Sequence, residues 1–461
     1  MSVVWYTLWF VIAVGLLVTI HEFGHFWVAR RLGFKVLRFS IGFGQPLKSW
    51  WVGSPADRTE IALAPIPLGG YVKLLDEREG PVAPEDLPRS FTRKHPFSRI
   101  VVLLAGPAFN ILFAVLVLAA MMWASGINQY LPVVGDVVAG SIAANAGLRS
   151  GDDILAINGS PVAEQRDVIF GLLDAMSSRG EADLSVRGRD GRIRNVDLDV
   201  RNSATRRHLT APMELFAGLG FQFYEPPIPA VLARVVPDGP AARAGLRQGD
   251  RVLSVDGHAV KTWSDLVAQI LPHPGGTISL TYERDGTAHT VQVEVGSAEV
   301  DGKYVGRIEA EAVQPADIPY PPGMVRHLSV SPLVAVARAT EEAWGMTALQ
   351  GRLFWRMMLG QVSLKNLSGP VSIAEYAGQS ASAGVSSFLG FLVLISLSLG
   401  FLNLLPIPIL DGGQILFQLI EWVKGSPMSE RAQAFGQQVG IALLILLMGV
   451  ALFNDIARQF S

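Results

Sequence analysis

Four long apolar runs dominate this sequence of 461 residues. They lie near residues 4–28, 100–124, 385–410 and 434–454, and Glu22 is the only charged residue within them. Crossing the hydrocarbon core of a bilayer takes roughly 20 helical residues. Half of the chain is hydrophobic and only 17% is charged, which is typical of a protein partly dissolved in lipid. The runs therefore predict a polytopic α-helical membrane protein with four transmembrane helices, and they argue against a soluble protein with four apolar core helices.

The distribution of basic residues predicts the orientation. We do not expect the first run to be a cleaved signal peptide, because MSVVWYT has no Lys or Arg and no small-x-small site precedes His21. Short cytoplasmic loops collect Lys and Arg, and the loop between the first two runs holds twelve of them, including Arg30, Arg31, Lys35, Arg38, Lys48, Arg89, Arg93, Lys94 and Arg99. We expect this loop in the cytoplasm, with both termini and the long segment after residue 124 on the opposite side.

That long segment contains an internal repeat. VVAGSIAANAGLRSGDDILAINGSPV, from Val137, matches VVPDGPAARAGLRQGDRVLSVDGHAV, from Val235. Each copy has a helix start at AGL, a GD turn, a short strand and later alternating strands. The copies resemble the circularly permuted PDZ domains of bacterial proteases, which implies that they bind extended peptide ends by strand addition. Copies that act only as spacers or steric filters are the alternative.

HEFGH, at residues 21–25, places polar groups where hydrocarbon is expected. Residues four apart share one helix face, so His21 and His25 project toward one point with Glu22 beside them. Two neutral imidazoles bind Zn²⁺ in this arrangement, and the carboxylate takes the proton of the attacking water. A charged side chain at membrane depth is costly and usually marks function. A pair of interfacial histidines with ordinary hydrogen bonds is the alternative.

A catalytic zinc site needs a third protein ligand. The third run ends GFLNLLPIPILDGG, where Asp411 is the first charge, and Pro406 and Pro408 prevent a regular helix. Irregular backbone at membrane depth is tolerated only inside protein or beside a wet cavity. Asp411 is therefore the best candidate for the third ligand. It could also cap the helix predicted for GGQILFQLIEWV.

Taken together, the motifs resemble those of the bacterial site-2 proteases of the regulator of sigma-E type. The shared features are HEFGH, AGPAFN at 105–110, the tandem repeat, LSGPVSIAEYAG at 367–378 and NLLPIPILDGG at 403–413. The resemblance implies an intramembrane zinc metalloendopeptidase of the bacterial inner membrane, with periplasmic PDZ domains and an active site near the cytoplasmic face. It implies His21, His25 and Asp411 as Zn²⁺ ligands and Glu22 as the catalytic base. Its substrates would be transmembrane segments of anti-sigma factor type and remnant signal peptides, cut in regulated intramembrane proteolysis.

Substrate binding is also implied by the resemblance. The extended pieces RFSIGFGQPLKSWWV and TEIALAPIPLGGYVKLL would form a membrane-associated β-hairpin or sheet whose edge pairs with unwound substrate. The implied substrate-binding residues are Gly69, Gly70, Tyr71, Asn403 and Pro406. A hairpin that only anchors the helices, and an Asn403 that only satisfies carbonyls freed near Pro406, are the alternatives.

These expectations divide the chain into five parts. They are an N-terminal membrane core at 1–126 with the β-loop at 36–75, PDZ domains at 127–220 and 221–312, an amphipathic helical connector at 313–384, and a C-terminal membrane core at 385–461. The connector helix, rich in Trp and Met, could rest on the outer membrane interface or pack against the PDZ domains. The expected partners are membrane substrates, peptide ends and lipid, with no nucleic acid.

Two other function classes compete with the protease. A noncatalytic tandem-PDZ adaptor on a membrane anchor would have no use for Glu22. A metal transporter would have no need of peptide-binding modules. The combination of HExxH with a distant Asp-Gly favours the protease.

Overall fold

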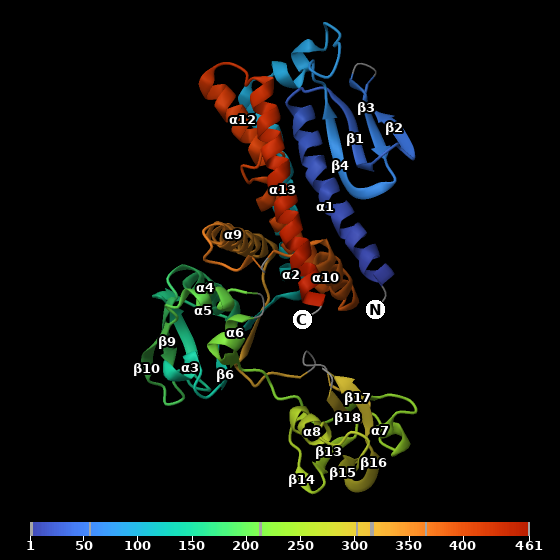
Figure 1. Ribbon diagram of the computed structural model, residues 1–461, viewed down its shortest axis with the longest axis vertical. Coiled ribbons are helices and arrows are strands. Elements are labelled where there is room, and N and C mark those ends of the chain that lie inside the picture. The colour runs from blue at the N-terminus through green and yellow to red at the C-terminus, as the bar shows by residue number, and fades with distance from the viewer. Residues whose placement is uncertain are drawn as a thin grey trace.

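The computed structural model describes residues 3–54, 57–211, 214–300, 303–313, 318–364 and 367–459. Within these ranges four helices are long and apolar enough to cross a membrane. They are α1 (Val3–Arg31), α2 (Pro96–Ser125), α11 (Val385–Asn403) and α13 (Glu430–Gln459). In Figure 1 the β-sheet of the first loop lies at one end of this helical part and the two modules lie at the other, on the side where α1 begins and α13 ends. The four predicted apolar helices are confirmed.

The third helix is shorter than predicted. It ends at Asn403, and a non-helical segment precedes α12 (Asp411–Lys424). The expected span of 385–410 was wrong at its end, because Pro406 and Pro408 cannot continue the hydrogen-bond ladder of a helix.

Of the two expected forms, hairpin or sheet, the first loop forms a four-stranded sheet. Its strands are β1 (Val36–Phe43), β2 (Lys48–Val52), β3 (Thr59–Leu63) and β4 (Ile66–Leu74). Their order is β2-β3-β1-β4, with β1 parallel to β3 and the other pairs antiparallel. The sheet packs against α1 through β1 and β4, and two short 3-10 turns, η2 (Leu87–Arg89) and η3 (Phe91–Arg93), lead to α2. The strand β4 is an edge strand beside the helix that carries HEFGH.

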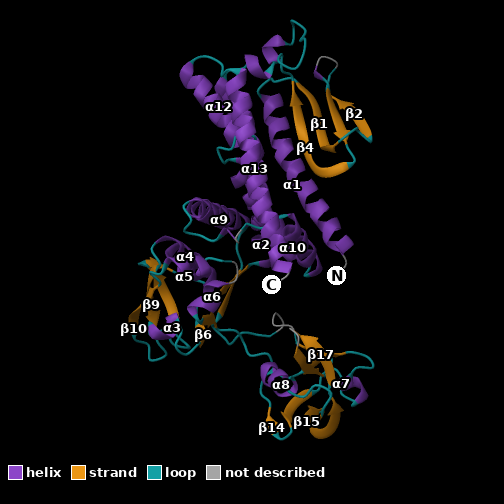
Figure 2. Ribbon diagram, in the orientation of Figure 1, coloured by secondary structure: helices purple, strands orange, loops and turns teal. Residues whose placement is uncertain are grey.

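Two β-rich modules follow α2 (Figure 2). The first contains β6 (Val134–Val137), α3 (Ile142–Asn145), β7 (Asp153–Ile157), β8 (Ser160–Pro161), α4 (Gln165–Ser178), β9 (Glu181–Arg187), β10 (Ile193–Asp199), α5 (Ser203–Leu209), α6 (Glu214–Leu219) and β11 (Phe221–Phe223). The second contains β12 (Leu232–Val235), α7 (Pro240–Arg243), β13 (Arg251–Val255), β14 (His258–Ala259), α8 (Trp263–Ile270), β15 (Thr277–Arg284), β16 (Thr287–Glu294), β17 (Gly296–Val300), β18 (Lys303–Arg307) and β19 (Ala310–Ala312). Each has its own apolar core.

The modules share one plan. Their main sheets have the equivalent orders β10-β9-β7-β8 and β16-β15-β13-β14. In each, the aspartate of the GD turn is buried and accepts both a backbone N–H and an arginine: Arg194 pairs with Asp152, and Arg284 pairs with Asp250. Matching turns at Asn158 and Asp256 both have positive φ. The repeat seen in the sequence therefore extends to strand order and to its buried ion pair.

The connector is not purely helical. The strand β20 (Val325–Leu328) pairs with β5 (Ile127–Tyr130), so β5 belongs to a two-stranded stalk and not to the main sheet of the first module. The helix α9 (Pro332–Met358) packs against α2 and α11 on one side and α4 on another, and α10 (Pro370–Ser382) packs against α1. On α9, Arg356 donates to Asp174 of α4 and Glu342 pairs with Arg166. Packing of the connector helix against the first module is thus observed.

Candidate metal centre

The helices α1 and α2 cross closely where HEFGH meets AGPAFN. A Cβ at Gly24 would lie 2.5 Å from the Ala105 backbone oxygen, and a Cβ at Gly106 would lie 2.3 Å from His25 Nε2. Only glycine fits at either position without movement of a neighbour. The two glycines therefore let the helices approach and let both imidazoles contact α2 at Gly106.

His21, His25 and Asp411 converge on one point, although Asp411 comes from the opposite end of the chain. The His21 and His25 Nε2 atoms are 3.2 Å apart, and Asp411 Oδ2 lies 3.1 Å from the first and 3.4 Å from the second. Both histidines are buried. Among the residues described, this trio is the group of His, Asp and Glu side chains whose arrangement could hold a metal ion.

The protonation of the imidazoles favours a cation between these atoms. His25 Nδ1 lies 2.8 Å from the Val102 carbonyl oxygen and can only donate to it, so its Nε2 presents a lone pair. His21 Nδ1 meets the Asn110 side-chain amide, whose Oδ1 has no other partner in the described chain and can accept the Nδ1 proton after a half turn of the amide. Such second contacts fix the tautomer of metal-binding histidines.

The distances also fit zinc. Asp411 Oδ2 is buried and is without a hydrogen-bond partner among the described residues. In the neutral tautomers assigned above, two imidazole lone pairs face it. Three electron-rich atoms this close repel one another unless a cation lies between them. Zinc bonds of about 2.0–2.1 Å in tetrahedral geometry place neighbouring ligand atoms ~3.3 Å apart, and the three observed separations are 3.1, 3.2 and 3.4 Å. The donor set and its spacing therefore fit Zn²⁺.

The turn before α12 places Asp411. After Asn403 the chain reverses through backbone hydrogen bonds between residues close in sequence, such as Ile407 N–H to Leu405 O. Gln414 Nε2 also donates to the Pro408 carbonyl oxygen. A Cβ at Gly412 or Gly413 would lie within 2.4 Å of the backbone of Leu404 or Ile407. The two glycines therefore allow the first turn of α12 to pack onto the broken backbone. Asp411 is the first helical residue and Leu410 is the N-cap, without a side-chain cap, so Asp411 does not cap the helix.

Glu22 lies beside the trio, between α1 and the edge strand β4. It is half-buried and lines the same cavity as Val72 of β4. A Cβ at Gly70 would lie 3.4 Å from Glu22 Cγ. A cavity of about 710 Å³ opens here and is lined by the trio, Glu22, Tyr71, Val72, Asn403 and Gln414. The carboxylate is thus placed to act on a molecule in the cavity.

The remaining predicted residues divide into two groups. Asn403 and Tyr71 line the cavity, and Gly70 lies against Glu22. Gly69 has a φ of +153° and faces Phe43, with no room for a Cβ, so it shapes the bend of β4. Pro406 is exposed and does not line the cavity. Sequence reasoning missed Val102, Gly106 and Asn110, although AGPAFN contains two of them.

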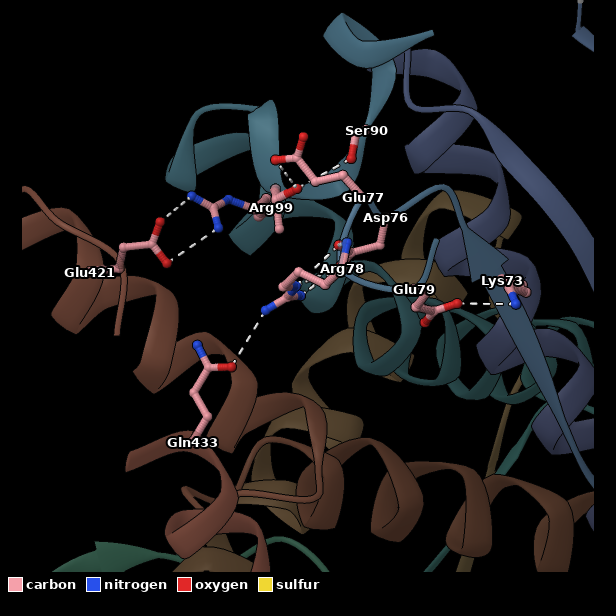
Figure 3. A network of polar contacts seen from close by, with 10 residues as sticks. Lys73, Asp76, Glu77, Arg78, Glu79, Ser90, Arg99, Glu421 and Gln433 are labelled. Atoms are coloured by element: carbon pink, nitrogen blue, oxygen red, sulfur yellow. Dashed lines mark hydrogen bonds and ion pairs between the residues drawn. The ribbon is translucent and has the colours of Figure 1, made fainter. Parts of the chain in front are cut away.

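The rim of the cavity carries a network of charges (Figure 3). Arg78 pairs with Asp76 and also donates to Gln433 of α13, and Lys73 pairs with Glu79. Burial alone would raise the pKa of Asp76, but hydrogen bonds from Arg78 outweigh it and hold that pKa below its ordinary value. The arrangement in the figure joins the loop after β4 to the C-terminal helices.

Two histidines one turn apart, a carboxylate from a distant segment and a glutamate beside them define a metal-dependent hydrolase site of the zincin type, here set among apolar helices. Residues 9–447 match the model of Peptidase family M50. The chain therefore belongs to this peptidase family.

Relatives cover the whole chain. It is 39% identical over 459 residues to "Regulator of sigma-E protease RseP" of Escherichia coli. The alignment covers 99% of this chain and 100% of that protein. It is also 39% identical to "Protease RseP" of Yersinia pestis, with coverage of 99% and 100%, and to "Putative zinc metalloprotease RSc1411" of Ralstonia nicotianae, with 98% of each. The PDZ domain of the SdrC-like protein of Listeria monocytogenes aligns with 20% of this chain and 92% of its own length, at 22% identity and a TM-score of 0.16, an overlap too slight to support an argument about the modules.

Proposed function

We propose that this peptidase is an intramembrane zinc metalloprotease that cuts transmembrane segments of single-span membrane proteins. The observation that carries the proposal is the convergence of His21, His25 and Asp411 beside Glu22, on helices long and apolar enough to span a membrane. The names of the relatives, a protease that regulates sigma-E and a putative zinc metalloprotease, agree with it. The substrates in this proposal are of anti-sigma factor type, cut in regulated intramembrane proteolysis, and remnant signal peptides are a second substrate class.

In this proposal the chain's residues divide the work. His21, His25 and Asp411 hold Zn²⁺, with Val102 O and Asn110 orienting the two imidazoles. Zinc supplies Lewis acidity, which polarises the scissile carbonyl and makes water available as a nucleophile near neutral pH. Glu22 accepts the proton of the attacking water at a carboxylate oxygen and delivers it to the nitrogen of the leaving amine.

The substrate binds as an added strand. A helical substrate hides its peptide bonds, so cleavage requires local unwinding and a partner for the exposed backbone. The edge strand β4 borders the cavity through Tyr71 and Val72, and its outer side has no strand neighbour among the described residues. Strand addition to such an edge satisfies the substrate backbone and presents it to Glu22. Asn403, on the opposite wall, donates or accepts one further backbone hydrogen bond. Gly69 and Gly70 shape the β4 wall, and Pro406 acts only by breaking the helix before Asp411.

The protein lies in the bacterial inner membrane with its sheet toward the cytoplasm and both modules in the periplasm. The basic residues of the sheet loop and the positive-inside rule support this orientation. The modules, roughly 127–220 and 221–312, act as PDZ domains. Support comes from the shared strand order and from a cavity of about 680 Å³ in the second module, between α8 and the strands β17 to β19, with an apolar wall that includes Leu266, Ile270 and Ile308.

The test replaces Glu22 with Gln in the full chain and measures bound zinc and cleavage of a transmembrane reporter. We expect one zinc per chain and no detectable cleavage, because the ligands remain and the proton acceptor is lost. Glu341→Gln, an exposed position on α9, is the matched control and should cleave normally. Cleavage by Glu22→Gln at the control rate would contradict the proposed role of Glu22.

A further inference from the structure

A buried ion pair links α2 to α12 away from the metal centre. Arg99 Nη2 lies 2.6 Å from Glu421 Oε1, and Nη1 lies 3.3 Å from Oε2, so the guanidinium grips the carboxylate with two parallel hydrogen bonds. Their side chains are only 5% and 14% exposed, and Arg99 also stacks 5.9 Å from the Phe91 ring. Figure 3 shows the two side chains pointing toward one another from separate helices. A bidentate contact of this kind fixes both distance and direction.

One face of α2 joins this ion pair to both histidines. Arg99 holds Glu421, Val102 accepts from His25, Gly106 touches both imidazoles and Asn110 meets His21. At 3.6 residues per turn these four positions fall within about 80° of one another around the helix. The histidines and the ion pair therefore share one rigid surface.

One face of α12 matches it in the opposite direction. Asp411 stands at the metal centre, Gln414 lines the cavity, Gln418 is buried and Glu421 reaches Arg99. Ten residues separate Asp411 from Glu421, which is roughly 15 Å of helix. Asn110 and Arg99 are separated by roughly 16 Å on α2 by the same rise, and the two helices pack against each other between these ends.

The rest of α12 offers little other control over its position. Its N-terminal side follows the proline-broken turn, and Gly425 ends it with a left-handed backbone. In its carboxyl-terminal half, Trp422 makes ring contacts with His95 and Phe97. Among the described polar contacts, the Arg99 guanidinium is the charged group that pairs with this half. Sliding or rotation of α12 on α2 would move Asp411 away from the histidines by a similar amount.

We propose that the Arg99–Glu421 ion pair positions the third ligand: it locks α12 against α2 and thereby sets where the Asp411 carboxylate stands relative to His21 and His25. This inference rests on the proposed metal centre and adds a residue pair that touches neither metal nor substrate. Arg99 and Glu421 are positioning residues, acting only through Asp411. Loss of the pair leaves both histidines in place and displaces the carboxylate.

The experiment measures zinc affinity of the full chain by competition with a chromogenic chelator, and the electronic spectrum of the Co²⁺-substituted protein, which reports the ligand set. The variants are Glu421→Gln, Asp411→Asn and the double variant. We expect Glu421→Gln to weaken zinc binding at least tenfold and to shift the Co²⁺ spectrum toward that of Asp411→Asn. In the double variant the zinc affinity should equal that of Asp411→Asn alone. A residue that acts only by positioning the Asp411 carboxylate has no further effect once that carboxylate is gone.

Arg284→Gln, which breaks the similar bidentate ion pair in the second module, is the matched control and should bind zinc normally. A zinc affinity and Co²⁺ spectrum of Glu421→Gln equal to those of this control would overturn the inference. It would also be overturned if Glu421→Gln lowered zinc affinity as much in the Asp411→Asn background as in the wild-type chain. If Asp411→Asn itself binds zinc normally, the proposed metal centre fails and the inference with it. If Glu421→Gln does not fold, Arg99→Lys replaces it, because Lys keeps the positive charge but cannot make two parallel hydrogen bonds to the carboxylate. A zinc affinity of Arg99→Lys equal to that of Arg284→Gln would then overturn the inference.

Discussion

Gly106→Ala is expected to destroy zinc binding with a single methyl group. The added Cβ would lie 2.3 Å from His25 Nε2, 2.6 Å from His25 Cε1 and 2.8 Å from His21 Cε1. Ordinary van der Waals contact begins at 3.4 Å, so the His25 ring must move by about 1 Å, whereas a metal site tolerates errors of about 0.2 Å in its bonds. The clash falls on His25 Nε2, the atom proposed to bind the metal, and on the ring carbons next to the two Nε2 atoms.

The magnitude follows from the loss of one ligand. Disturbing residues behind the ligands typically costs 10–100-fold in metal affinity, so direct displacement of His25 should cost at least about 100-fold, or ~2.7 kcal/mol. The fold should survive, because Ala favours the helix over Gly by about 1 kcal/mol and a free imidazole can turn away. Apo protein should therefore unfold at or above the wild-type temperature while zinc affinity falls.

The assay is chelator competition on the full chain in detergent, with Gly390→Ala as control. Gly390 lies on α11, and a Cβ there would meet nothing within 4 Å. Zinc affinity of Gly106→Ala within threefold of this control would refute the close packing of α2 against the ligands.

Three further predictions follow from the same contacts. His21→Ala and Asp411→Asn should each lower zinc occupancy, measured by metal analysis after dialysis, and full occupancy in both would remove them as ligands. Gly24→Ala should destabilise the chain by about 1–3 kcal/mol, because its Cβ would meet the Ala105 backbone at 2.5 Å and α1 and α2 must separate. Thermal unfolding checks this, with Gly449→Ala as the control because the space around Gly449 is open. Equal unfolding midpoints for the two variants would contradict the prediction. Asp250→Asn should lower the unfolding free energy of the second module by about 1–3 kcal/mol, because Asp250 is buried and pairs with Arg284. The expected sign is faster amide hydrogen exchange confined to β13 and β15. Unchanged exchange would show that the ion pair contributes little to stability.

Much of the site could be predicted because its chemistry is local in sequence. HEFGH fixes two imidazoles and a carboxylate on adjoining positions of one helix, and Asp411 stands out as a charge at the end of an apolar run. The two segments are almost four hundred positions apart. The prediction that they meet rested on the need of zinc for a third ligand and not on a sequence pattern. The distances between His21, His25 and Asp411 agree with it.

What was missed depends on contacts between helices. Nothing in the spacing of AGPAFN shows that Val102 O faces His25 or that Gly106 lies under the rings, since those contacts exist only after α1 and α2 pack. The Arg99–Glu421 ion pair is invisible for the same reason. The carboxyl end of the third apolar helix was misplaced because hydropathy continues through the prolines after the helix has stopped.

The sheet illustrates a second limit. The sequence predicted extended pieces in a hairpin or sheet, without a strand order. The observed sheet places β3 parallel to β1 and leaves β4 at the edge beside Glu22. Strand order is a tertiary property, and in this fold it decides which edge faces the cavity.

X-ray absorption at the zinc edge of the full chain in lipid nanodiscs would test the metal centre most directly. We expect one zinc per chain with two imidazole nitrogens and at least one carboxylate oxygen at about 2.0–2.2 Å, and the loss of one oxygen contribution in Asp411→Asn. Zinc bound with no imidazole scattering, or a spectrum unchanged by both His21→Ala and Asp411→Asn, would contradict the proposed site.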